Sequence, residues 1–225
     1  MKIKYDLKQI YPKVWLVTMD NSYDLAMTFC RVQEFYESPY KEIRGKIFTI
    51  TEFQRIYTMR RGSDSFTYPA DWAGFNVPSN IIFDLYYEHN ILDLNEYDAI
   101  FNKILDKINT VASSDENKYY LIGSQKGNQT TIDHEVAHAF YYLYPAYKKE
   151  ANKIIKQLPK RLEKKITDWL LEIGYNKEVF KDEIQAYLSA DNLSHDINST
   201  DKENKKIKKI SNDLKKLVEK YKKMD

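Results

Sequence analysis

The chain has 225 residues, of which 43% are hydrophobic and 30% are charged, and its formal net charge is +2. The apolar content is sufficient for a folded core, and the nearly neutral balance gives no sign of a chain built as a whole to bind nucleic acid. No apolar run approaches the roughly 20 residues of a membrane-spanning helix, no secretory signal is visible at the N-terminus, and one cysteine, Cys30, cannot form an intrachain disulfide. We therefore expect a cytoplasmic protein, of cellular, viral or mobile-element origin.

The first half of the chain predicts a mixture of strands and helices. Residues 13–18 have the pattern of a short buried strand, whereas residues 24–36, 51–60 and 95–111 carry apolar side chains at helical spacing. The aromatic segment 66–83 contains proline and glycine, so we expect irregular structure, or a short strand and loop, packed on the core because so many of its residues are apolar.

The second half predicts a strand at 119–123 followed almost entirely by helices. Thr130 and Asp133 match the capping pattern of a helix start, and that helix should run to about Tyr144, before Pro145. The remaining helices are expected at 147–157, 159–173, 176–189 and 201–223. We predict an α+β, predominantly helical fold. It comprises one domain, 1–200, with an N-terminal part (1–118) and a part carrying the strand, a central helix and a helical subdomain (119–200), followed by a basic amphipathic C-terminal helix, 201–225.

The predicted helix that begins near Thr130 contains the sequence HEVAH, an instance of the H-E-x-x-H pattern. Positions i and i+4 share one face of an α-helix, so His134 and His138 can present two imidazoles to one metal ion. Glu135 lies beside them, where a carboxylate can act on a water molecule. The opposite side of the helix is apolar and should face the core, through Ile132, Val136, Ala139, Phe140 and Leu143. The pattern predicts a Zn²⁺ site.

A catalytic zinc site needs a third protein ligand. The sequence after His138 contains neither a further histidine at the spacing H-x-x-G-x-x-H nor any cysteine, so a later segment must supply that ligand. Glu183 is our first candidate, because it lies on the widened apolar side of its helix, where an unpaired carboxylate would be costly. Pairing with a lysine is the alternative role for Glu183. Glu172 and His195 are the next candidates for the ligand.

The motif together with a glutamate on a later helix resembles the zincin metallopeptidases, and among them the gluzincins, over residues 130–190. The resemblance implies zinc, a peptide or protein substrate, a sheet whose edge strand holds that substrate, and a helical subdomain that brings the glutamate ligand. The strand at 119–123 precedes the motif helix, as the substrate-binding edge strand often does in that family. Two features depart from the thermolysin-like members: the gap from His138 to Glu183 is longer, and Tyr187 replaces the acidic residue that orients a ligand histidine.

The implied reaction is peptide-bond hydrolysis in which zinc polarises the scissile carbonyl and Glu135 is the general base. A hydrogen-bond donor must also stabilise the oxyanion. Tyr187 is our catalytic candidate for that role, with Tyr141 and Tyr142 as further candidates; the alternative is that Tyr187 is a core tyrosine.

The C-terminal helix has ten lysines between residues 202 and 223 and an apolar seam at Ile207, Ile210, Leu214, Leu217 and Tyr221. We expect the seam to dock on the protein body and the lysines to face solvent. The alternative is that these lysines make a weak contact with nucleic acid or an acidic partner. The alternatives to a peptidase are a catalytically inactive zincin-like protein that binds a partner, and a basic nucleic-acid-binding module.

Overall fold

The computed structural model describes residues 3–111, 118–190, 193, 197 and 199–224. The chain forms two compact units, Met1–Asn128 and Gln129–Asp225, each with its own core. His195, the last of the predicted ligand candidates, lies outside the described residues.

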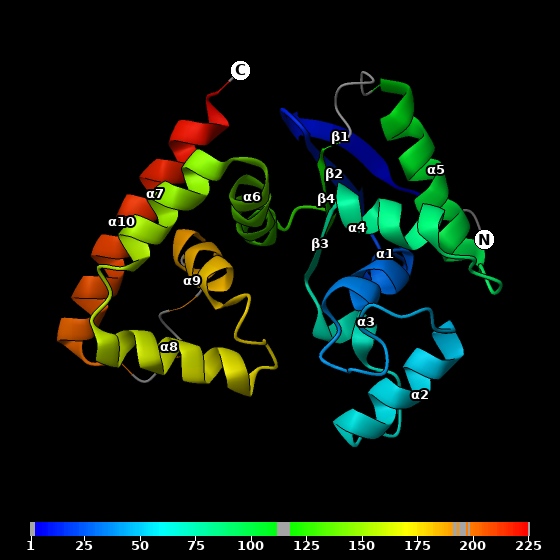
Figure 1. Cartoon of the computed structure of the whole chain (residues 1–225), viewed down its shortest axis with the longest axis horizontal. Helices are drawn as coiled ribbons and strands as arrows, with labels where there is room; N and C mark the ends of the chain where they lie inside the picture. The colour runs from blue at the N-terminus through cyan, green and yellow to red at the C-terminus, as the bar shows by residue number, and fades with distance from the viewer. Residues whose placement is uncertain (1–2, 112–117, 191–192, 194–196, 198, 225) are drawn as a thin grey trace. The chain divides into compact units, whose positions relative to one another are not determined.

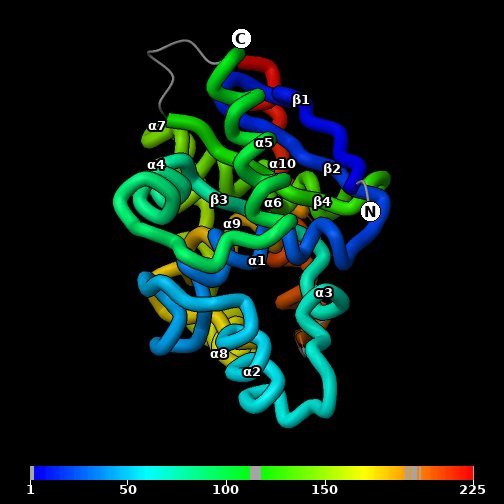
Figure 2. The backbone as a smooth tube through the Cα atoms, turned by 90° about the vertical axis from the view of Figure 1, so that its right-hand side faces the viewer, coloured from blue at the N-terminus to red at the C-terminus, as the bar shows by residue number. Residues whose placement is uncertain are grey.

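The first unit is built on a mixed sheet with the order β1-β2-β4-β3. Its strands are β1 (Asp6–Tyr11), β2 (Val14–Met19), β3 (Gly74–Pro78) and β4 (Tyr120–Gln125). Strands β1 and β2 form an antiparallel hairpin, which Figure 2 shows in blue, whereas β2 and β4 are parallel and β3 is antiparallel to β4. The predicted strands at 13–18 and 119–123 are therefore confirmed as β2 and β4.

The resemblance placed the strand at 119–123 at a sheet edge, and this prediction is wrong. Strand β4 pairs with β2 on one side and β3 on the other, so its backbone groups are already used within the sheet. Among the described strands, β1 and β3 form the two edges. An extended peptide that joined this sheet would have to pair with one of those two strands.

The helices of the first unit confirm the three predicted from periodicity and add short ones that were missed. They are α1 (Ser22–Glu37), α2 (Ile50–Arg61), α3 (Tyr68–Asp71), α4 (Ser79–Phe83), the π-helical turn η1 (Asp84–Glu88) and α5 (Glu96–Val111). The segment 66–83, expected to be irregular or a short strand and loop, contains the strand β3 together with the short helices α3 and α4. It packs on the core as predicted, with Tyr68, Phe75 and Ile82 buried.

Helix α1 packs against strands β2, β3 and β4, and α5 packs against α1 (Figure 1). The side chain of Asn21 caps the first turn of α1 by accepting from the backbone N–H groups of Tyr23 and Asp24. Gly123 of β4 allows the close approach, since a Cβ atom there would lie 2.6 Å from the ring of Phe29. Cys30 is fully buried on the same helix, as expected.

Helix α1 also carries two buried ionisable side chains, Arg31 and Glu34, whose surroundings differ. The guanidinium of Arg31 donates to both carboxylate oxygens of Asp98 on α5, at 2.8 and 2.9 Å, and to the carbonyl of Phe48 at 2.7 Å. Glu34 is 5% exposed, and burial raises the pKa of its carboxyl to about 7, although the hydroxyls of Ser38 and Tyr68 favour ionisation.

The second unit is wholly helical in its described residues. Its helices are α6 (Gln129–Leu143), α7 (Pro145–Ile155), α8 (Lys160–Glu172), α9 (Phe180–Ser189) and α10 (Asp201–Lys222). Helix α9 packs against each of the other four, and α7 and α10 lie side by side (Figure 1). Helix α6 begins one residue before Thr130, so Thr130 lies inside the first turn and not at the predicted cap position.

Helix α10 docks on the rest of the second unit through its predicted seam. Ile207, Ile210, Leu214, Leu217 and Tyr221 are all buried. The ring of Tyr221 packs on Phe140, Tyr144 and Tyr147. Thr200 and Glu203 form a capping box at the start of α10, and Glu203 also pairs with Lys165 of α8 at 2.9 Å.

The fold class is α+β, with 61% helix and a small four-stranded mixed sheet, so the prediction of an α+β, predominantly helical protein is confirmed. Within the described part of the chain, no helix combines the length and apolar character needed to cross a membrane.

Candidate metal centre

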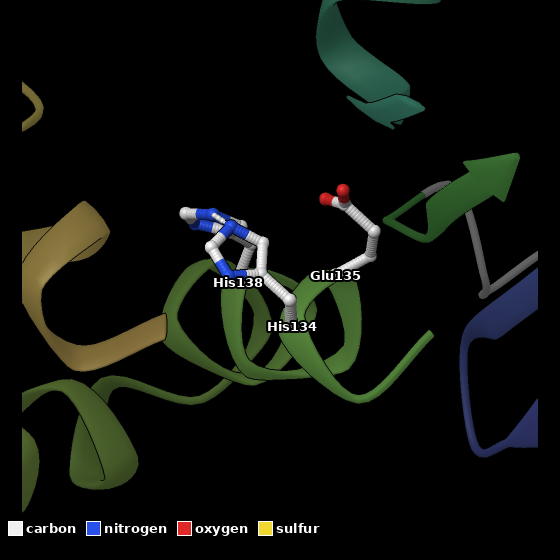
Figure 3. A group of neighbouring side chains, drawn as sticks. All are labelled: His134, Glu135 and His138. Atoms are coloured by element: carbon white, nitrogen blue, oxygen red, sulfur yellow. Dashed lines mark hydrogen bonds between the residues drawn. The ribbon is translucent and has the colours of Figure 1, made fainter. Parts of the chain in front are cut away.

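Two histidines of α6 meet on one face of the helix. His134 and His138 are one helical turn apart, and their Nε2 atoms lie 3.2 Å from each other (Figure 3). Glu135 rises beside them, and the donor atoms of these three buried residues all lie within 4.8 Å of one another. The H-E-x-x-H pattern thus brings together a buried group that could hold a metal ion.

Glu183 reaches the same point from α9. One carboxylate oxygen lies 3.6 Å from Nε2 of His138, and the other lies 3.8 Å from Nε2 of His134. The residue is 4% exposed, as its position among apolar neighbours on α9 suggested. The structure therefore places the first candidate for a third ligand next to both histidines, because α9 packs directly on α6.

Asp182, the residue before Glu183, holds the other side of the His138 ring. Its Oδ1 atom lies 2.8 Å from Nδ1 of His138 and accepts a hydrogen bond from Gln185 at 3.0 Å, while Gln185 accepts one from Tyr147 at 2.8 Å. Carboxylates commonly orient metal-binding histidines in this way. Gln185 is fully buried, whereas the Asp182 side chain is 29% exposed, so the neighbouring helices cover this side of α9 only in part.

The two imidazoles differ in their affinity for a proton. Burial, followed by the neighbouring His138, lowers the pKa of His134 well below its usual range. Burial would also lower the pKa of His138, but Asp182, Glu183 and Glu135 outweigh it and raise that pKa well above the usual range. Three carboxylates thus approach two imidazoles; those of Glu135 and Glu183 are buried, and that of Asp182 is partly exposed.

Aromatic rings enclose the His134 side. The Tyr187 ring lies edge to face with the His134 ring, with centroids 4.6 Å apart, and Trp169 of α8 packs on the other side of Tyr187 at 4.9 Å. The hydroxyl of Tyr187 lies 3.4 Å from that of Tyr175, in the loop after α8. Burial, then Glu183 and Tyr187, raises the pKa of Tyr175 well above its usual range.

The donor geometry fits a divalent cation. Metal–nitrogen bonds of about 2.0–2.1 Å place two nitrogens of a tetrahedral ion about 3.3 Å apart, close to the 3.2 Å between the two Nε2 atoms. The distances to Glu183 are a few tenths of an ångström longer, which a small rotation of a glutamate side chain can remove. A cation would also balance the surplus of buried carboxylates, which is costly without a counter-charge.

The other predicted candidates are less well placed. Glu172 is exposed at the end of α8. Among the tyrosines proposed as oxyanion donors, Tyr141 donates its hydroxyl to Asn152 of α7 at 3.1 Å, and Tyr187 faces His134 with its ring.

Three residues of the site were not identified from the sequence. Trp169 and Tyr175 come from α8 and the loop after it, and only the packing of α8 on α9 brings them near the histidines. The sequence did contain one indication for Asp182, which directly precedes the candidate ligand Glu183. A turn of α9 that presents the Glu183 carboxylate to α6 can also present the Asp182 carboxylate.

Comparisons with known proteins identify no relative: no protein-family model matches the chain, and neither a curated protein nor a solved structure matches it. The functional interpretation therefore depends on the chemistry of the site alone.

Proposed function

We propose that this protein is a zinc-dependent metallopeptidase that hydrolyses peptide bonds of a peptide or protein substrate. The observation that supports the proposal most strongly is the pair of buried imidazole nitrogens 3.2 Å apart on α6, with the Glu183 carboxylate 3.6 and 3.8 Å from them. Two histidines and one carboxylate form a known ligand set of catalytic zinc, which leaves a fourth position for water or substrate.

Each residue of the chain has a separate task in this proposal. His134, His138 and Glu183 would hold the ion, which supplies Lewis acidity that acidifies water and polarises a carbonyl group. Glu135 accepts a proton from the attacking water and later delivers it to the leaving amine. Asp182 holds the Nδ1–H of His138, so the Nε2 lone pair stays directed at the metal position.

The decisive experiment compares Glu135→Gln with the wild-type chain. Zinc content is measured by elemental analysis, and cleavage is measured on a peptide library with and without a chelator. We expect one zinc per chain in both proteins and a rate about 10²–10⁴-fold lower in the variant, the usual contribution of a general base. Glu172→Gln is the matched control, because Glu172 is an exposed carboxylate in the same unit.

Two outcomes would redirect the proposal. A wild-type chain that binds zinc but cleaves no member of the library would favour a catalytically inactive zincin-like protein that binds a partner. Cleavage that survives in Glu135→Gln would remove this residue from the general-base role.

A second candidate function, binding of an acidic partner, is favoured by the outward face of α10. Lys205, Lys208, Lys209 and Lys216 are exposed, and no ion pair involves any of them in the described part of the chain. The apolar face of α10 is buried in the unit, so an interaction here would be electrostatic.

The test of this second function is salt dependence. Affinity for a labelled acidic peptide and for DNA is measured by fluorescence anisotropy across a range of salt concentrations. The logarithm of the binding constant should fall linearly with the logarithm of the salt concentration. The substitution of Lys205, Lys209 and Lys216 by Glu should abolish binding. Preference for DNA would support a nucleic-acid contact, and binding unchanged by the three substitutions would exclude this face.

A further inference from the structure

The two histidines of the metal centre are oriented by different kinds of contact. His138 is held by the carboxylate of Asp182 at its Nδ1 atom, 2.8 Å away. The corresponding Nδ1 atom of His134 is buried and has no hydrogen-bond partner among the described residues. Metal-binding histidines ordinarily donate this second nitrogen to a carboxylate, a carbonyl or a water, which fixes the plane of the ring.

Aromatic packing replaces the hydrogen bond at His134. The Tyr187 ring meets the His134 ring at 70° with centroids 4.6 Å apart, which is a favourable edge-to-face arrangement. The Tyr187 ring is itself held between Trp169, at 4.9 Å and 80°, and Tyr175, whose hydroxyl lies 3.4 Å from its own. Rotation of the imidazole about χ2 would therefore have to displace a ring that has neighbours on its other sides.

We infer that Tyr187, supported by Trp169, is a positioning residue that sets the orientation of the His134 imidazole for metal binding through its ring and not through its hydroxyl. This inference rests on the proposed function, because it treats His134 as a metal ligand. It also changes the role of Tyr187, which the sequence had suggested as an oxyanion donor.

The test measures zinc affinity by competition with a chromophoric chelator, with zinc alone as the probe. Tyr187→Leu, which removes the ring, should bind zinc about 10-fold more weakly, at the lower end of the effect of losing an orienting group. Tyr187→Phe, which keeps the ring, should restore affinity close to that of the wild type. Trp169→Leu should weaken binding less, in the same direction, because it removes only the support of the ring.

A spectroscopic measurement separates positioning from general stability. Cobalt(II) bound in place of zinc reports coordination geometry through its visible absorption, and we expect a changed spectrum in Tyr187→Leu but not in Tyr187→Phe. Tyr144→Leu is the matched control, since Tyr144 is a partly buried ring of the same unit that packs on Phe140 and Tyr221. Circular dichroism melting of all variants identifies any that fail to fold.

Measurements on the metal-free protein distinguish failure of this inference from failure of the proposed function. The carbon-bound ring protons of His134 should show one sharp set of NMR signals in the wild type and in Tyr187→Phe, and broadened signals in Tyr187→Leu and Trp169→Leu. The His138 signals should stay unchanged throughout.

A wild type that binds no zinc but shows this NMR pattern would contradict the metal site and leave the ring contact established. Zinc affinity in Tyr187→Leu equal to that of the wild type, or an equal loss in Tyr187→Phe, would overturn the inference.

Discussion

The two units of this chain bury charge in opposite ways. In the first unit, Arg31 and Asp98 neutralise each other, and the guanidinium also donates to the carbonyls of Phe48 and Asp93, at 2.7 and 3.2 Å. In the second unit, the carboxylates of Glu135, Asp182 and Glu183 converge on two imidazoles. The charge of Arg31 is thus neutralised within the protein, whereas the proposed function assigns a cation to the second cluster.

Under the proposed function, this difference separates a structural cluster from a metal-binding one. A buried ion pair whose hydrogen bonds are all satisfied can stabilise a fold without any ligand. The removal of one partner then lowers the free energy of unfolding. A buried excess of negative charge is tolerated when it binds a cation, so the removal of one of its carboxylates should weaken cation binding. The four predictions that follow test this distinction, from the largest expected effect to the smallest.

Breaking the complete cluster should cost the most stability. Arg31→Met leaves Asp98 buried without its partner, and we expect the free energy of unfolding of the first unit to fall by about 3–5 kcal/mol. Chemical denaturation, followed by the fluorescence of Trp15 and Trp72, measures the loss. Arg60→Met is the control, because Arg60 and its partner Glu42 are both half exposed and such pairs contribute about 0–1 kcal/mol. Equal losses in the two variants would remove the structural role of the Arg31 cluster.

Glu34 provides a pH-dependent test within the same unit. Its folded-state pKa of about 7 lies above the ordinary value of 4.5, so the protonated form is favoured by folding. The corresponding stability is complete below pH 4.5 and is lost as the pH rises to 7 and above. The shift corresponds to about 3 kcal/mol at 1.36 kcal/mol per pKa unit. Glu34→Gln should therefore gain about that much relative to the wild type between pH 4.5 and pH 8 in denaturation experiments. A constant difference across this range would show that Glu34 is ionised in the fold.

Asp182→Asn should weaken metal binding and leave the fold largely intact. The amide cannot accept the hydrogen bond of His138 with the strength of a carboxylate, and we expect zinc affinity to fall about 10–100-fold. Calorimetric titration with zinc measures the change. Asp168→Asn is the control, since Asp168 is exposed and pairs with the exposed Lys164 of the preceding turn. Unfolding of the second unit without change in zinc affinity would make Asp182 a structural residue.

The smallest effect is expected at Glu203, which lies at the start of α10 with its side chain 15% exposed. Its pKa is lowered to about 2 by the backbone N–H of Thr200 and by Lys165. The stability that this charge provides is present above the ordinary value of 4.5 and disappears as the pH falls towards 2. Glu203→Gln should thus be slightly less stable than the wild type at pH 7, and the difference should vanish in acid. Thermal melts from pH 2 to pH 7, read at the helical circular dichroism signal, would reveal it; a difference that persists at pH 2 would mean that the lost contact is not electrostatic.

Periodicity in the sequence was sufficient for most of the helices and for part of the metal centre. The spacing of His134 and His138 determines that they share a face, and the apolar neighbours of Glu183 indicated that its side of α9 is buried. Both signals are local, because they depend on which face of one helix a residue occupies. The amphipathic helices α1, α5 and α10 were predicted for the same reason.

The features that the sequence did not predict depend on which other helices and strands pack around a given element. The full burial of Gln185 could not be predicted from the sequence, because it depends on the helices that pack around α9. Strand β3 was only one of two alternatives expected for residues 66–83, because Gly74 and Pro78 bound a segment too short for a clear alternation. The interior position of β4 depends on pairing with β3, which lies more than forty residues earlier in the chain.

The docking of α10 has a consequence for how the protein is made. Helices α6 to α9 leave the ribosome before α10, yet α9, α7 and α6 all pack against it, and Tyr221 completes the aromatic cluster with Phe140, Tyr144 and Tyr147. A nascent chain that ends before residue 221 therefore exposes those rings to solvent and to chaperones. Since α9 also carries Glu183, we expect this carboxylate to reach its position beside His134 and His138 only after α10 has emerged.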